Sequence, residues 1–183
     1  MSERAQWTLR DLAQLEAVLE AMTTSPSDEA EGLSELDHGL QCAAELAIAA
    51  PEDEALQIAG LVHDIGHGRS DIADHAIAGE ALLREVLGER IAAIVGLHVA
   101  AKRYLVATDQ GYFARLSPTS VLSLAVQGGA FTPAEATAFE ARPYWREAVM
   151  LRRADEAAKV LGRKVPGLEH CRAALRRVAA LAN

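Results

Sequence analysis

The chain has 183 residues, a formal net charge of −8 at pH 7, and 50% hydrophobic but only 4% aromatic residues. It is long enough to bury a sizeable core, and its acidic balance argues against nucleic acid or an anionic membrane as a partner, since both require a basic surface. The abundance of Ala, Leu, Glu and Arg, which are good helix formers, predicts an all-α protein.

Two further features concern compartment and domain number. Cys42 and Cys171 are far apart in the sequence, and each falls in a helical pattern. Reduced, buried thiols are therefore expected, as in a cytoplasmic protein. The sequence shows no signal-peptide pattern, no apolar run of about 18 residues and no linker composition. We expect a cytoplasmic protein with a single domain over residues 1–183, whose oligomeric state the sequence leaves open.

The first part of the chain alternates helical stripes with an acidic loop. Apolar residues from Trp7 to Met22 recur at helical spacing and predict an amphipathic helix that ends near Thr23. Residues 24–32 are acidic and small, which is typical of a loop and would suit a lid. A second apolar stripe over residues 33–47 carries His38 in its first turns.

The next helix carries the most informative stretch of the sequence. Pro51 is expected to open this helix, and its apolar run ends in His63-Asp64 before Gly66 and Gly68, which permit a sharp turn. The imidazole and the carboxylate then lie at the end of a buried helix. A carboxylate so placed has two oxygens, and each can hold one of two cations about 3.5 to 4 Å apart.

The remaining sequence is helical by the same criteria. One helix with His75 near its start is predicted to end at Gly88, and the stripe that follows places His98 and Lys102, four residues apart, on one face. Ser117-Pro118 and Thr132-Pro-Ala-Glu135 are typical helix starts, the second a full capping box. A helix from Tyr144 to Lys159 and a last helix after Pro166 complete the pattern.

Five of the six histidines fall within residues 38–98. Any one of them alone would more often be an ordinary core or surface histidine, but together they indicate a metal site. Asp155, among Leu151, Ala154 and Ala158, would be costly to bury unpaired. Imidazole with carboxylate suits iron, manganese or zinc better than calcium or magnesium. We predict one ion held by His38, His63, Asp64 and Asp155, and a second held by His75, His98 and the shared Asp64.

These residues resemble a known family. His38, the pair His63-Asp64 and Asp155 are similar to the H...HD...D signature of the HD-domain superfamily, which implies an all-helical bundle with the metal site in its core, here about residues 31–160. His75 and His98 resemble the dinuclear branch. Residues 97–105, 116–121 and 151–159 resemble the HD-domain oxygenases of phosphonate degradation.

The resemblance implies a chemistry. Those oxygenases use a mixed-valent Fe²⁺/Fe³⁺ pair and O₂ to cleave the carbon–phosphorus bond of 1-hydroxyalkylphosphonates such as 2-amino-1-hydroxyethylphosphonate, releasing phosphate. It also implies that His67 and Lys102 act in catalysis and, with Arg152, bind the phosphonate, and that Glu31 meets a substrate amine. Asp28 stands where the amine-handling members have a tyrosine. Ser120 is a weaker candidate for a hydroxyl that donates a hydrogen bond to the substrate. A solvent-facing or backbone-bonded serine would fit the sequence at least as well.

Two other functions remain open from the sequence alone. A phosphohydrolase acting on a small phosphate ester or nucleotide could use the same metals to generate a hydroxide nucleophile. A non-catalytic metal sensor is the third possibility, but a full ligand set beside cationic side chains argues against it. In each case the expected partner is a small molecule.

Overall fold

The computed structural model describes residues 8–27, 32–67 and 73–182. Within these residues the regular structure is helical, apart from one isolated β-bridge between Pro26 and Ser34. The all-α prediction is confirmed. The helices are α1 (Leu12–Ala21), α2 (Glu35–Ala49), α3 (Glu54–Val62), α4 (His75–Thr108), the 3₁₀ helix η1 (Phe113–Arg115), α5 (Pro118–Val126), α6 (Pro133–Glu140), α7 (Trp145–Ala157) and α8 (Leu168–Ala182).

Side-chain caps set the beginnings of most of these helices. A side-chain oxygen accepts a hydrogen bond from a first-turn amide at Asp11, Ser34, Asp53, Ser117 and Thr132, which satisfies a group that the helix itself cannot. The predicted capping box at Thr132 and Glu135 is confirmed. Pro51 does not open α3, contrary to expectation, because Asp53 caps the helix two residues later and leaves Pro51 in the preceding turn.

The element α4 consists of the two helices predicted on either side of Gly88, joined across a kink. Gly88 has φ 80° and ψ 171°, a non-helical conformation that glycine adopts at little cost, so the predicted helix end at Gly88 is confirmed. By length and composition α4 could cross a membrane, but 56% of its apolar window is buried inside the protein. Its apolar residues therefore build the core.

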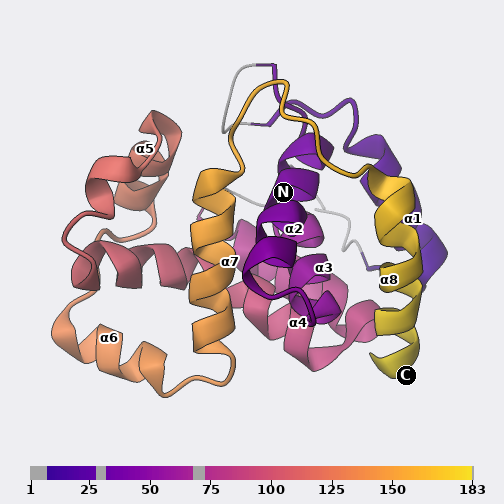
Figure 1. Ribbon diagram of the computed structural model, residues 1–183. Coiled ribbons are helices and arrows are strands. Elements are labelled where there is room, and N and C mark those ends of the chain that lie inside the picture. The colour runs from indigo at the N-terminus through magenta and orange to yellow at the C-terminus, as the bar shows by residue number, and fades with distance from the viewer. Residues whose placement is uncertain (1–7, 28–31, 68–72, 183) are drawn as a thin grey trace, which may run out of the picture.

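Four helices surround the centre of the molecule. α2 packs against α3 and α7, and α4 packs against α3, α7 and α8. Figure 1 shows α5 and α6 on one side of α7, and α1 and α8 on the opposite side of the molecule. The main hydrophobic core runs through α1, α2, α3, α4, α7 and α8. A smaller aromatic cluster joins the second half of α4 to α6 and α7.

Two glycines allow close backbone contacts beside His38, His63 and His75. A Cβ atom at Gly39 would lie 2.4 Å from the carbonyl oxygen of Leu61, so α2 and α3 touch backbone to backbone. A Cβ atom at Gly66 would lie 2.0 Å from the carbonyl oxygen of His75, so the turn after α3 rests on the start of α4. Neither approach would tolerate a larger residue.

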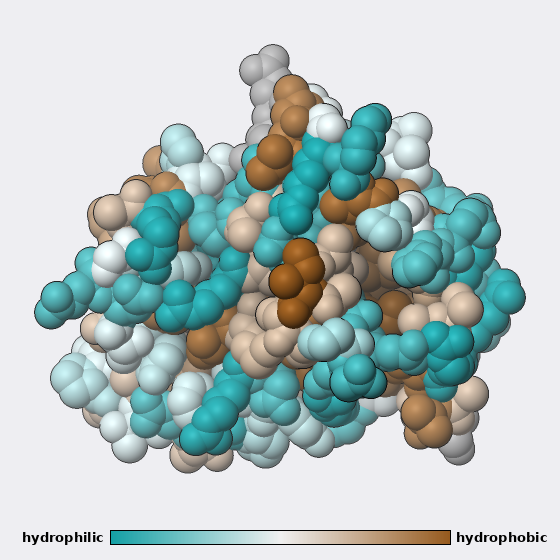
Figure 2. Space-filling model, viewed as in Figure 1, coloured by the Kyte–Doolittle hydropathy of each residue, from teal (hydrophilic) through white to brown (hydrophobic). Residues whose placement is uncertain are grey.

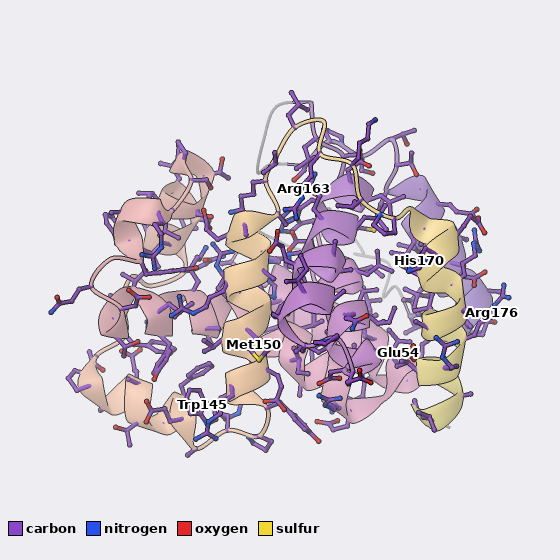
Figure 3. All side chains as sticks on the ribbon, in the orientation of Figure 1. Glu54, Trp145, Met150, Arg163, His170 and Arg176 are labelled. Carbon is purple, nitrogen blue, oxygen red and sulfur yellow. The ribbon has the colours of Figure 1, made fainter. Side chains whose placement is uncertain are left out.

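An apolar groove of about 400 Å³ lies on the surface between α2, α3 and α8. Glu54 and His170, labelled in Figure 3, line it. Figure 2 shows hydrophobic residues over the middle of this largely hydrophilic face, where Figure 1 places α2. A second cavity is lined by His67, His75 and His98. Within the part of the chain that the structure describes, the groove shares no lining residue with it.

Candidate active site

Three buried imidazoles are oriented by backbone carbonyl groups. Each Nδ1 lies within hydrogen-bond distance of a carbonyl oxygen, at 3.0 Å for His38 on Ala158, 2.8 Å for His63 on Gly60 and 2.7 Å for His98 on Val95. Because a carbonyl oxygen only accepts, each Nδ1 carries the proton. Each Nε2 therefore faces the centre of the bundle as a potential metal ligand.

Asp64 lies between two sets of these donors. Its Oδ2 is 3.4 Å from the Nε2 of His38 and 3.2 Å from that of His63. Its Oδ1 is 3.7 Å from the Nε2 of His75 and 3.8 Å from that of His98. One carboxylate therefore presents a different oxygen to each set. This is the arrangement of a bridging ligand between two cations.

The first set contains buried polar atoms whose hydrogen-bonding capacity is unused. Within the described part of the chain, the Nε2 atoms of His38 and His63 and the Oδ1 of Asp155 are buried without a hydrogen-bond partner. Asp155 Oδ1 is 3.3 Å from the Nε2 of His38 and 3.9 Å from that of His63. Such orphaned atoms are rare in proteins and costly. A metal ion would satisfy all three, so the donor set fits one.

The electrostatics of the cluster favour a cation. Burial alone would raise the pKa of Asp64 and Asp155, yet both pKa values are held well below the usual range, by His63 and His67 for Asp64 and by Arg152 and Lys159 for Asp155. Burial lowers the pKa of His38, but the two carboxylates outweigh it and raise that pKa well above its usual value. Positive charge beside the imidazoles therefore stabilises the two carboxylates, and either protons or a metal ion can supply that charge.

The second set is less uniform. His98 is buried, and burial together with His75 and His63 holds its pKa well below the usual value, so its imidazole is neutral. The Nε2 atoms of His75 and His98 lie 2.9 Å apart. His67 lies in the turn after α3, and its ring centroid is 4.3 Å from that of His75. Donor atoms of Asp64, His67 and His75 all lie within 4.8 Å of one another and could also hold an ion.

A cavity opens beside the second set. One group of lining residues contains Asp64, His67, His75, His98 and Asp155, and a second group contains Lys102, Thr119, Ser123, Gln127 and Arg152. Its free volume is only about 20 Å³. The Lys102 ammonium is buried and donates to the Ser123 hydroxyl at 2.7 Å. Cationic side chains beside a carboxylate–imidazole cluster suit an anion that also reaches a metal.

Arg152 is more tightly engaged than the sequence suggested. Its guanidinium donates to the carboxylates of Asp155 and Glu156, to the Tyr112 hydroxyl at 2.8 Å and to the Ser120 hydroxyl at 3.1 Å. It lines the cavity, but two carboxylates already share its charge. It therefore orients Asp155 as much as it offers positive charge to a ligand.

Ser120 lies behind the cavity wall rather than in its lining. It is fully buried, and its hydroxyl accepts from Lys159 at 2.8 Å and donates to Glu156 at 3.3 Å. The cavity hydroxyls are instead those of Thr119 and Ser123 on the same helix. Glu31 and Asp28 lie outside the described residues.

Several residues of the site carried no assignment from the sequence. Glu156 ties α5 to α7, since its carboxylate accepts from the Ser117 amide at 2.8 Å and from Lys159 at 3.0 Å. Glu35 lies 3.3 Å from His67. Their spacing offered a weak signal, because Glu156 follows Asp155 directly and Glu35 stands three residues before His38. Such spacing is common on helices that bind nothing.

Comparison with known families agrees with this geometry. Residues 36–158 match the HD domain family model. The chain belongs to the HD domain family and is one of its enzymes, and the predicted HD-type helical fold is confirmed.

Two similar proteins have informative names. One is the hydroxymethylphosphonate dioxygenase of Gimesia maris, 39% identical over 76% of this chain and 74% of its own length. Another is the [1-hydroxy-2-(trimethylamino)ethyl]phosphonate dioxygenase (glycine-betaine-forming) of Leisingera caerulea, 36% identical over 76% of each chain. The resemblance to HD-domain oxygenases of phosphonate degradation is confirmed.

Proposed function

We propose that this enzyme is a di-iron, O₂-dependent oxygenase that cleaves the carbon–phosphorus bond of a 1-hydroxyalkylphosphonate. The observation that carries the proposal is Asp64, whose two oxygens face two sets of imidazole donors beside a cavity that Lys102 also lines. The named activities of the two relatives support the same reaction class.

The proposed ligands are those expected from the sequence. His38, His63 and Asp155 would hold the first ion, His75 and His98 the second, and Asp64 both. Imidazole and carboxylate donors without a thiolate suit iron. A mixed-valent iron pair would supply O₂ activation and a Lewis acid for the substrate oxygens.

We assign the phosphonate end to Lys102. Its buried ammonium and the Ser123 hydroxyl line the same cavity as the second donor set. Arg152 supports this end, with its charge shared between Asp155 and Glu156. His67 also lines the cavity and would contact the substrate there. A dianion entering an acidic protein is thereby met by local donors.

We infer that the substrate carries no ammonium group at its carbon end. Among the described residues, the carboxylates that line the cavity, Asp64 and Asp155, are the ones assigned to metal. Neither is left to pair with an ammonium group. Hydroxymethylphosphonate therefore fits better than 2-amino-1-hydroxyethylphosphonate, unless Glu31 reaches the substrate.

The balance of the reaction is simple for hydroxymethylphosphonate. One O₂ is consumed, the carbon–phosphorus bond breaks, and the carbon leaves as formate while the phosphorus leaves as phosphate. Each product gains one oxygen atom. No further reductant is needed, because the substrate carbon supplies the electrons that reduce O₂.

The test is anaerobic loading with Fe²⁺, followed by simultaneous measurement of O₂ uptake and phosphate release with each of the two phosphonates. We expect one O₂ consumed per phosphate released, faster with hydroxymethylphosphonate, and no O₂ uptake with simple phosphate esters. Phosphate release from an ester without O₂ uptake would instead indicate a phosphohydrolase. If the enzyme prefers 2-amino-1-hydroxyethylphosphonate, and Glu31→Gln weakens the binding of that compound alone, Glu31 recognises the substrate amine.

A further inference from the structure

His67 is placed relative to Asp64 as the two imidazoles of the second donor set are. Its Nε2 is 3.7 Å from Asp64 Oδ1, compared with 3.7 Å for His75 and 3.8 Å for His98. Three imidazole nitrogens therefore surround the same carboxylate oxygen at nearly equal distances. Distance alone gives no reason to count two of them as donors to an ion and leave out the third.

Glu35 orients the His67 ring. The Nδ1 of His67 lies 3.3 Å from Glu35 Oε1, and an ionised carboxylate only accepts, so the proton belongs on Nδ1. The Nε2 then keeps its lone pair on the side of Asp64. A carboxylate behind a ligating histidine is the usual support for a metal-bound imidazole.

Glu35 has little other reason to be buried. Its side chain is 7% exposed, and its second oxygen, Oε2, is buried without a hydrogen-bond partner in the described part of the chain. Burying a carboxylate with one partner is costly. A favourable interaction with the start of α2 would not require burial, since the exposed Asp37 serves that helix end equally well.

We propose that His67, oriented by Glu35, is a fourth protein donor to the second ion when no substrate is bound, and that the substrate displaces it. The proposal rests on the two-ion site proposed above. His67 is the donor suited to exchange, because it lies in a turn and its side chain is 17% exposed, whereas those of His75 and His98 are 6% and 3% exposed within α4. Once displaced, His67 remains at the cavity mouth to contact the substrate.

The experiment measures metal affinity rather than turnover. Metal-free protein is titrated anaerobically with Fe²⁺ against a competing chelator, with and without saturating hydroxymethylphosphonate. The variants are His67→Ala and Glu35→Gln. The matched controls are His170→Ala, a histidine on α8 in Figure 3, and Glu45→Gln, a glutamate of α2 paired with Arg163. Circular dichroism checks that each variant is folded.

We expect Glu35→Gln to weaken binding of the second ion about tenfold, the lower end of the effect of outer-shell changes, and His67→Ala to weaken it more than Glu35→Gln does. The first ion and both controls should stay near the wild-type affinity. Saturating phosphonate should remove most of the difference between wild type and His67→Ala, since the substrate takes the place of the imidazole in both.

Different failures have different meanings. An unchanged second-ion affinity in His67→Ala, with two ions bound by the wild type, would overturn the role of His67 and leave the two-ion site intact. Binding of a single ion by the wild type would overturn both. A difference that persists undiminished under saturating phosphonate would show that His67 is a permanent ligand, which contradicts the proposed exchange.

Discussion

The two walls of the cavity are held in place by different means. The imidazole–carboxylate wall is carried by α2, α3, α4 and α7 and the turn after α3, which pack against one another through the main core, with backbone contacts at Gly39 and Gly66. The second wall, as we call the other group of lining residues, includes Lys102 of α4 and Arg152 of α7. Its remaining part is α5, which carries Thr119 and Ser123. This helix is tied to α7 through the side chains of Glu156 and Lys159.

The difference matches the demands on each wall. Metal ligands must be held to within a fraction of an ångström, and packed helices provide that precision. A wall that admits and releases a substrate benefits from attachments that can break and re-form at low cost. Residues on the first wall should therefore govern metal content, and residues on the second should govern substrate affinity.

The largest effect on the second wall is expected at Lys102. Lys102→Met should raise the apparent Michaelis constant for hydroxymethylphosphonate roughly ten- to a hundredfold, because one charge-assisted hydrogen bond contributes about 1.5 to 3 kcal/mol. Iron content should not change. Steady-state kinetics with metal analysis tests this, with the exposed Lys164→Met as control. Loss of iron in Lys102→Met would contradict the proposal that the first wall governs metal content and the second governs substrate affinity.

A smaller effect is expected at Glu156. Glu156→Gln keeps the shape of the side chain but weakens its bonds to the Ser117 amide, Arg152 and Lys159, since charge-assisted bonds are roughly twice as strong as neutral ones. The amides of α5 should exchange with solvent roughly ten times faster, with those of α3 unchanged. Glu140→Gln, which alters a surface bond to Tyr104, is the control. Equal protection of α5 in both variants would mean that packing, not Glu156, holds this helix.

The sequence predicted the first wall much better than the second. His38, His63, Asp64, His75, His98 and Asp155 were assigned to metal from their types and their positions at helix ends or on apolar stripes, and the structure brings all six together. Histidine and aspartate on buried helical positions are unusual, so their pattern stands out. Helix starts such as Thr132 were predicted for the same reason, since capping is a local interaction.

The second wall depends on contacts between distant segments. Glu156 reaches Ser117 across 39 residues. Glutamate and lysine usually lie on the solvated surface, so nothing local marks Glu156 or Lys159 as part-buried. Arg152 is a similar case. Its spacing from Asp155 predicted that it faces the site, but its pairing with both Asp155 and Glu156 is seen only in the fold.

The position of α3 shows a third kind of limit. Proline favours the first turn of a helix, but Asp53 both caps α3 and pairs with Arg90, whose guanidinium lies 2.9 Å from Asp53 Oδ1. Arg90 lies on α4, so the choice between the two starts depends on a tertiary contact.

The most direct test of the central claim is the number of metal ions bound by Asp64→Ala compared with His98→Ala, measured by elemental analysis after anaerobic iron loading. If Asp64 joins two ions, Asp64→Ala should lose both, and His98→Ala should keep the first while binding the second more weakly. Circular dichroism confirms that both variants fold. Two full equivalents of iron in folded Asp64→Ala would contradict the account.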